Sequence, residues 1–496
     1  SPHRAADALF ATFTTAALVE VTLSLVNARL TGSATADPIA VAGIVTHKEW
    51  TEQTGEVTVS GRPVMHRRYT VRFADPARVL WRQHYPCELH VDKTLKDVID
   101  AQKGAKITMT HDWAAELDAT RPLVFLPLGI PENAASFYDF LCWFLATRNG
   151  VLTYDSKTKA YKLTGVKAAT GTALPLKPTE VGPVRLEFPE APRASAVILN
   201  SSSAIVAKSP ATVNASGVAG VRRDFLLRDP VSANIDARKT LEEARLAARG
   251  HEVVVPFALY PTHTVLPGAL VDFSHAGFGA AVFTATKTYR IRELTVRASN
   301  AEQDPSPEDD VSPRPFTAAV VARLELKTEP WVPLPAFVAP RWPARVEGTI
   351  VSEQGDEPEE TWQAYTDSAT SLDRYKVKVP LYKASADVFV FAPFDPNGMP
   401  GHLYFPAYKG ATVLLAFQLF SVLIEKFLDW RATGRLPMDG QGNHILVGKT
   451  PTNRTSMSHV YVDQKPVLLV ARLNDKDTQT IELKDGTITI RTKEDA

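Results

Sequence analysis

Cysteine is nearly absent from this chain, and so is any excess of one charge. The 496 residues include two cysteines, Cys87 and Cys142, which excludes a disulfide-stapled scaffold and fits assembly in a reducing compartment. Lysine plus arginine and aspartate plus glutamate each number 55. With no net charge to attract a polyanion, we expect neither nucleic acid nor an anionic membrane as a partner.

Long uninterrupted hydrophobic runs are missing as well. The stretch 1–26 is broken by Glu20 and has no small-residue cleavage site, so we predict no classical signal peptide. The longest apolar segment, 411–428, contains Glu425 and Lys426 and falls short of a membrane span. Export of such a chain would need another route.

Proline is abundant, and alternating strand patterns dominate. The chain has 36 prolines, more than the usual share of about 5%, which is typical of the loops and edge strands of a β-rich protein. Alternation of apolar and polar residues predicts half-buried strands at 19–30, 39–50, 67–75 and 284–298. Shorter helices are predicted over 92–102 and 236–249.

Residues 131–163 form the most informative stretch. Asn133 is a candidate N-cap, and Asn149-Gly150 supplies a left-handed stop. A hairpin turning around 155–159 follows at once. Between cap and stop, apolar residues at helical spacing predict one strongly apolar face, formed by Phe137, Phe140, Leu141, Phe144 and Leu145.

The pattern changes after Pro343. Short strands at near-regular spacing predict a small barrel of the OB type, at 374–382, 387–394, 401–417 and 443–450. The last residues, 480–493, alternate about an Asp485-Gly486 turn. Two short strands cannot bury their apolar face alone, so this end is expected to need partner chains or further repeats.

Several stretches are informative when they are taken in order along the chain. They are AVAGIVTHKEW, RYTVRFADPARVLWRQHYPCELHVDKTLKDVIDAQ, SFYDFLCWFLATRNGVLTYD, ARKTLEEARLAARG, LPGALVDFS, YRIRELTVRA, RYKVKVPL, MPGHLYFPAYKGATVLLAF and DGQGNHILVGK. Together they resemble the valine–glycine repeat protein G family (VgrG), the spike of type VI secretion. They also look like the hub and central-spike proteins of contractile-tail phages.

The resemblance implies a mainly β fold with an α+β hub. It divides the chain into a first barrel-like hub domain (1–165), a second one that can interleave with it and ends in a proline-rich linker (166–341), an OB-like small barrel (342–455), and the start of a trimeric β-helical or β-prism stem (456–496). The family's long β-helix is missing or cut short at Ala496.

The implied function is that of a structural hub and spike base in a contractile injection system, adapting a hexameric inner tube to a trimeric membrane-piercing spike. The implied partners are two further copies of the chain, an Hcp-like tube protein, baseplate proteins, a PAAR-like tip protein and effector cargo. The target membrane would be pierced rather than bound. Assembly is expected in the bacterial cytoplasm, with no cofactor and no enzymatic activity.

Interface roles are expected on the central helix and the terminal strands. The expected trimer-interface residues are Phe140, Phe144, Ile481, Leu483, Ile488 and Ile490. The chain departs from the family at 417–433, where a helical stripe either packs internally or docks a partner; it consists of Phe420, Leu423, Ile424, Phe427 and Leu428. A local basic stretch is either a solvated strand face or a contact with a neighbouring subunit, and contains Arg62, Arg67, Arg68, Arg72, Arg78 and Arg82.

Three patterns suggest chemistry, but for each of them an ordinary structural interpretation is favoured. His84, Cys87 and His90 have ligand-like spacing without a second cluster, so loop packing is favoured over a metal site. Residues 442–450 nearly spell a phosphate loop but are strand-like. Carboxylates such as Asp373, Asp395 and Asp439 cannot be paired by sequence, which leaves a cell-wall hydrolase as one alternative and a β-rich adhesin or tail-fibre module as another.

Overall fold

The computed structural model describes most of the chain and divides it into two compact units. The described residues are 8–26, 39–59, 62–167, 171–201, 206–210, 217–227, 232–247, 249–262, 265–279, 282–300, 316–353, 363–366, 368, 373–382, 387–391, 409–429, 443–450 and 452–494. Unit 1 comprises Ser1–His84, Lys103–Trp113 and Ser136–Ala339; unit 2 comprises Tyr85–Gln102, Ala114–Ala135 and Pro340–Ala496.

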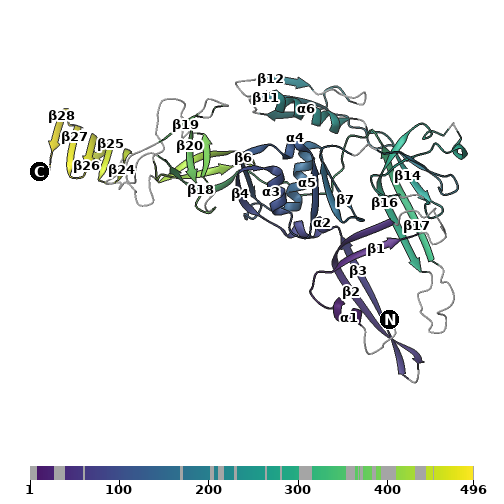
Figure 1. Ribbon diagram of the computed structural model, residues 1–496. Coiled ribbons are helices and arrows are strands. Elements are labelled where there is room, and N and C mark those ends of the chain that lie inside the picture. Colours follow the sequence, from purple (N-terminus) through teal and green to yellow (C-terminus); the bar gives the residue numbers. More distant parts are fainter. Residues whose placement is uncertain are drawn as a thin grey trace. The chain divides into compact units, whose positions relative to one another are not determined.

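The mainly β class predicted from the sequence is confirmed, because strands dominate both units (Figure 1). Residues 85–102 and 114–135, which the sequence assigned to the first hub domain, belong to unit 2. None of the helices in the described part of the chain has the length and apolarity needed to cross a bilayer.

Unit 1 begins with a three-stranded antiparallel sheet. Its strands are β1 (Glu20–Leu25), β2 (Ile39–Val59) and β3 (Arg62–Ala74), with β2 in the middle. Helix α1 (Ala8–Phe13) packs two rings on this sheet, Phe10 edge-on to Trp50 and Phe13 edge-on to Tyr69. Helix α2 (Pro76–Leu80) and the 3₁₀ turn η2 (Trp81–Gln83) follow β3.

The predicted central helix and hairpin are confirmed, with a shifted start. Helix α5 (Phe137–Arg148) begins after Ser136, which forms a capping box with Asp139, rather than after Asn133. Asn133 instead accepts from the Ala135 amide, a local turn that delays the helix. Strands β7 (Val151–Asp155) and β8 (Ala160–Thr164) form the hairpin, and β5 (Thr108–Asp112) adds in parallel to β8.

The other part of unit 1 is an open six-stranded sheet with its own core. The strands, in sheet order, are β10 (Arg185–Glu187), β14 (Glu252–Phe257), β17 (Phe316–Leu326), β16 (Thr288–Asn300), β15 (Leu270–Asp272) and β9 (Leu174–Pro175). The short 3₁₀ turn η3 (Ala276–Phe278) lies between β15 and β16. Valines, leucines and Tyr289 fill this core.

A small α/β layer completes unit 1. Strand β11 (Ser195–Ser201) lies between β12 (Val206–Pro210) and β13 (Arg222–Leu227). Helix α6 (Ser232–Leu246) packs on it through Leu246, which clusters with Ala196 and Phe225.

Unit 2 contains a six-stranded sheet where the sequence predicted an OB-like barrel. Five strands pair in a ring that returns to its first member, in the order β18 (Ala344–Val351), β22 (Thr412–Phe417), β23 (Val422–Asp429), β21 (Asp387–Phe391) and β20 (Asp373–Lys378). The β21–β23 link is a single parallel residue pair, so the predicted barrel is not fully closed. The short β19 (Tyr365–Thr366) pairs with β20 outside the ring.

The helix predicted at 417–433 is wrong: these residues include strand β23, which lies between β22 and β21 in this sheet. The register with β22 shifts at Glu425, a β-bulge. The bulge changes the period of the inward residues, so that Val422, Ile424 and Phe427 all reach the core. These inward residues are spaced by two and then by three positions, and the spacing of three resembles that of one face of a helix.

A hairpin from far upstream in the chain shares the barrel core. Strands β4 (Cys87–Thr94) and β6 (Thr120–Pro127) pair antiparallel, with α3 (Leu95–Gln102) and α4 (Ala114–Leu117) between them in sequence. The Phe125 ring lies 4.7 Å from that of Phe417, and the Phe125 amide donates to the Leu419 carbonyl. The barrel therefore depends on residues more than 200 positions away.

A five-stranded antiparallel meander, the C-terminal sheet, ends the described chain (yellow in Figure 1). Its strands are β24 (Asn443–Thr450), β25 (Asn453–Val462), β26 (Lys465–Asn474), β27 (Asp477–Lys484) and β28 (Thr487–Lys493). The expectation that 443–450 closes the barrel is wrong, because β24 pairs with β25. The predicted Asp485-Gly486 turn is confirmed, and both residues have positive φ.

Candidate functional site

The three residues with ligand-like spacing have other contacts. The His84 ring packs against Phe137, and Cys87 Sγ lies 3.2 Å from Tyr382 Oη. His90 lies 3.2 Å from a Glu88 carboxylate oxygen, and burial lowers the pKa of its imidazole. Among the described residues, no three or more histidine, cysteine and acidic side chains are grouped so that they could hold a metal ion.

The near-match to a phosphate loop is a β-strand. The backbone of β24 is extended and pairs with β25 from Asn443 to Gly448, so successive amides point in opposite directions, whereas a phosphate loop turns them toward one ligand. Of the carboxylates considered for hydrolysis, Asp373 starts β20. Asp395, Asp439 and Gly442 lie outside the described residues.

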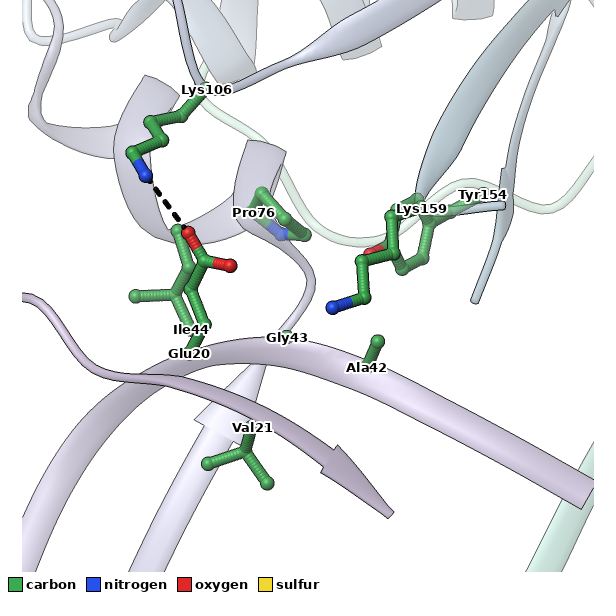
Figure 2. A pocket seen from close by; sticks show the side chains of 9 residues that line it. All are labelled: Glu20, Val21, Ala42, Gly43, Ile44, Pro76, Lys106, Tyr154 and Lys159. Carbon is green, nitrogen blue, oxygen red and sulfur yellow. Dashed lines mark hydrogen bonds and ion pairs between the residues drawn. The ribbon is translucent and has the colours of Figure 1, made fainter. Parts of the chain in front are cut away.

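The small cavity in Figure 2 has mixed charge. It encloses about 50 Å³, and the side chains of Lys106, Lys159, Tyr154 and Glu20 line it. Lys106 Nζ lies 3.1 Å from Glu20 Oε1, so one ammonium is already neutralised. A cavity of this size holds one or two waters rather than a substrate.

Phe140 and Phe144, expected at the trimer interface, are core residues of unit 1. Neither ring has exposed surface, and the two pack on each other, with Trp113 against Phe144. A side chain with no exposed area in the single chain cannot contact a second chain directly. This part of the interface prediction is corrected, since a hydrophobic stripe in sequence does not tell an internal core from an interface.

The C-terminal sheet carries two rows of mostly apolar residues on one face, here called the apolar face. Cross-strand pairing places the first row across all five strands: Ile445, Met457, Val470, Ile481 and Ile490. The second row, one step along the strands, contains His459, Leu468, Leu483 and Ile488. All four terminal-strand residues expected at an interface lie in these rows.

The apolar face is the more exposed of the two. Ile481, Leu483, Ile488 and Ile490 are 43%, 39%, 69% and 73% exposed. The alternate residues on the opposite face are of mixed polarity and more covered: Val467 and Ser458 are buried, and Leu469, Thr480 and Glu482 are half-buried. The apolar face is therefore the side that the single chain leaves open to another chain.

The geometry of the apolar face suits packing against other sheets. Each row crosses neighbouring strands, which lie about 4.8 Å apart, so it runs perpendicular to the strands. A hollow of about 520 Å³ opens beside Pro466, Leu483 and Ile488. Covering one isoleucine side chain fully contributes about 1.5–3 kcal/mol, so covering both rows would hold an assembly together.

The residues of the proposed docking stripe fall on both sides of β23. Ile424 and Phe427 pack in the barrel core, while Leu423 and Leu428 face outward. The Phe420 ring, just before the strand, packs under the Arg121 guanidinium. A docking role therefore stays a prediction for the outward residues alone.

The basic stretch is partly used inside unit 1. Arg67 pairs with Glu52 at 2.7 Å and covers the Phe10 ring, and Arg82 lies over the Tyr138 ring. Arg68 and Arg72 share the opposite, exposed face of β3. Arg67 and Arg82 therefore make contacts within the fold, whereas Arg68 and Arg72 are exposed and available to a neighbouring chain.

Comparison with known proteins gives a likeness of fold alone. No family model matches this chain, and no curated protein matches it by sequence. A chain in the solved "PdpA-VgrG Complex, Lidless" is 11% identical, with a TM-score of 0.63 over 96% of this chain and 91% of that one. The Francisella half-lidded complex gives 11% identity and a TM-score of 0.64 over 96% of this chain and 81% of that one.

A 43 kDa tail protein of prophage MuSo2 from Shewanella oneidensis is 13% identical. It covers 63% of this chain and 90% of its own, with a TM-score of 0.38. The likeness to the chain in the PdpA–VgrG complex is the more extensive one, and it shows a shared fold over nearly the whole of this chain.

Proposed function

We propose that this protein is a structural hub and spike-base component of a contractile injection system and works as a homotrimer. In this proposal the β-rich hub regions adapt a hexameric inner tube to a threefold spike, and the C-terminal sheets of three copies form the start of the stem. Force comes from sheath contraction elsewhere in the particle. The chain itself contributes rigidity and shape.

The apolar face of the C-terminal sheet is the observation that carries this proposal. Two mostly apolar rows lie on the more exposed side of a sheet whose other side, which is of mixed polarity, is the more buried. Three such sheets around one axis would bury all of their rows together. An intertwined stem of this kind also resists unfolding, because its strands are covered by more than one chain.

The fold likeness supports the same class of function. The similar chain belongs to a complex whose name includes VgrG, and the likeness covers 96% of this chain. The ordered series of VgrG-like stretches in the sequence points independently in the same direction. At 11% identity the family assignment itself remains part of the proposal.

The partners and the compartment follow from the same proposal. A tube protein of the Hcp kind, baseplate proteins, a PAAR-like tip and effector cargo would surround the trimer. Assembly would take place in the bacterial cytoplasm, and the target membrane would be pierced rather than bound. No cofactor is proposed, and we expect purified protein to release no fragments from peptidoglycan.

Mass photometry of the purified full chain tests the proposal. Each chain has a mass of 54.3 kDa, so the expected species has about 163 kDa, three times that value. A stable monomer at micromolar concentration would count against a hub. Peptidoglycan cleavage that depends on a single carboxylate would favour the hydrolase, and glycan binding by a monomer would favour the adhesin.

A further inference from the structure

We propose that residues 329–338, here called the strap, lie along helix α5 with one end anchored and the other releasable, so that release of the second end frees the point where the chain leaves unit 1. Unit 1 ends at Ala339, and the strap is therefore its last stretch before the chain enters unit 2. The difference between the two ends is a property of unit 1 alone. Its use, which is to give way at a defined place when the sheath contracts, rests on the proposed function.

The first end of the strap is anchored beside the last turn of α5. Asn149 Nδ2 donates to the Pro330 carbonyl, and Asn149 Oδ1 accepts from the Val332 amide, at 2.8 and 3.1 Å. The Trp331 amide between them donates to the carboxylate of Glu329 at 3.2 Å. Both Glu329 and Val332 are buried, so this end is held by packing as well as by hydrogen bonds.

Helix α6 secures the same end. The Arg245 guanidinium lies 5.5 Å from the centre of the Trp331 ring and donates to the Ala146 carbonyl in the last turn of α5 at 2.6 Å. It also pairs at 2.8 Å with Glu242, whose side chain is buried. Charge-assisted hydrogen bonds of this kind are among the stronger ones. One arginine therefore contacts both α5 and the strap, and several interactions must break before the first end can open.

The second end is held by much less. The Val338 amide donates to Asp139 Oδ1, in the first turn of α5, at 3.2 Å. Among the described residues, this is the only hydrogen bond that 333–338 make. Residues 333–339 are exposed or half-buried, and Val338 itself is 50% exposed. A hydrogen bond that is open to water contributes little to stability, so the second end is the one that opens first.

The strap has little slack between its two attachments. The chain from Val332 to Val338 can span at most about 20 Å when it is extended. Their partners Asn149 and Asp139 are separated by about 15 Å along the helix axis. Two prolines between the attachments stiffen the chain further. While Val338 is bound, the point where the chain leaves unit 1 is fixed at the start of α5. After release it can move anywhere within about 20 Å of Val332.

The two ends therefore open in a fixed order. Proteolysis of a locally opened segment follows the population of the open form. The end at Val338 should be open more often than the end at Val332, because fewer contacts hold it. Removing the carboxylate of Asp139 should raise the open population of the second end by about tenfold and leave the first end unchanged.

Limited digestion of the native full chain with chymotrypsin, followed by mass spectrometry of the fragments, tests this order. The protease cleaves after aromatic residues, and the strap has one near each end, Trp331 and Phe337. The wild type should be cut after Phe337 well before it is cut after Trp331. Asp139→Ala should speed the cut after Phe337 by about tenfold and leave the cut after Trp331 as slow as before.

Ser136→Ala is the matched control, because Asp139 also belongs to the capping box of α5. This variant removes the hydrogen bond from the Asp139 amide to Ser136 Oγ and keeps the carboxylate that accepts from Val338. It should be cut after Phe337 at the wild-type rate. Equal acceleration in Ser136→Ala and Asp139→Ala would assign the effect to fraying of the helix and reject the strap.

The wild type alone also decides the question, should Asp139→Ala fail to fold. Cleavage after Trp331 first, or after both residues at the same rate, rejects the strap. Mass photometry of the same sample keeps this result separate from the proposed function. A trimer with the wrong order of cleavage rejects the strap and leaves the hub standing, whereas a monomer with the expected order rejects the hub and the use of the strap under load.

Discussion

Asn149 ends helix α5 through both its backbone and its side chain. Its backbone is left-handed, with φ 55°. In its side-chain amide, Nδ2 donates to the Pro330 carbonyl at 2.8 Å, and Oδ1 accepts from the Val332 backbone amide at 3.1 Å. Gly150, which the sequence also assigned to this stop, has a different role. A Cβ there would lie 2.5 Å from the Trp113 ring, so this position needs glycine for space.

Asn149→Ala should destabilise unit 1 by about 2–3 kcal/mol, since a left-handed alanine is strained and two hydrogen bonds are lost. Asn149→Gly loses only the hydrogen bonds and should cost about 1–2 kcal/mol. Urea denaturation of the full chain measures both. Equal losses for the two variants would show that the backbone conformation contributes nothing.

Tyr289 links stability to alkaline pH. Burial raises the pKa of its phenol to about 12, and its hydroxyl lies 2.8 Å from His251 Nε2. An unfolded tyrosine ionises near pH 10. Between pH 10 and 12 the folded chain therefore retains a proton that the unfolded chain has lost, so this residue makes stability fall as pH rises, by about 1.4 kcal/mol per pH unit.

Tyr289→Phe should remove that contribution. Between pH 9 and pH 11, urea unfolding of the variant should lose about 1.4 kcal/mol less stability than the wild type does. Tyr85→Phe, at an exposed tyrosine, is the control and should follow the wild type. A Tyr289→Phe variant with unchanged pH dependence would contradict the account of this site.

At the scale of elements, strand β23 separates the two interpretations of 417–433. On the predicted helix, Leu423 and Ile424 would share one face. On the strand they point in opposite directions, and Leu423 is 52% exposed whereas Ile424 is 9% exposed.

Ile424→Ala should therefore cost about 2–4 kcal/mol through a cavity in the barrel core, whereas Leu423→Ala should cost under about 1 kcal/mol. Chemical denaturation of the full chain compares the two. Similar losses for both variants would contradict the strand.

Local patterns in the sequence predicted local structure well. The α5 stop at Asn149, the hairpin of β7 and β8 and the turn at Asp485-Gly486 all depend on neighbouring residues. The helix predicted over β23 was wrong because bulges at Glu425 and Leu428 changed the strand period. The packing of Phe125 on Phe417 could not be predicted, because no local pattern reports a contact across nearly 300 residues.

The sequence could not tell which apolar residues the fold leaves exposed, for a similar reason. Phe140 and Ile490 are both apolar residues in regular patterns, yet the first is fully buried and the second is 73% exposed. Sequence shows that a row is apolar, whereas only the fold shows which rows the chain covers itself. The terminal-strand residues are exposed in the single chain, so their interface role stays a prediction, whereas the two helix residues are buried.

At the scale of the whole molecule, one feature connects fold and proposed function. Each described core is filled from within its own unit, but the apolar face of the C-terminal sheet is left to solvent. An exposed apolar row of this length would promote nonspecific association unless a defined partner covers it. Identical copies around an axis are the partner that the proposal supplies.

The most direct test places one charge on either side of the same strand. Ile488→Asp and Ile490→Asp add a carboxylate to the apolar face, and Thr489→Asp adds one to the opposite face between them. Mass photometry at pH 7.5 should find trimers for the wild type and Thr489→Asp, and monomers for the two isoleucine variants. Trimers of Ile488→Asp and Ile490→Asp as stable as the wild type, or a monomeric wild type, would contradict the account.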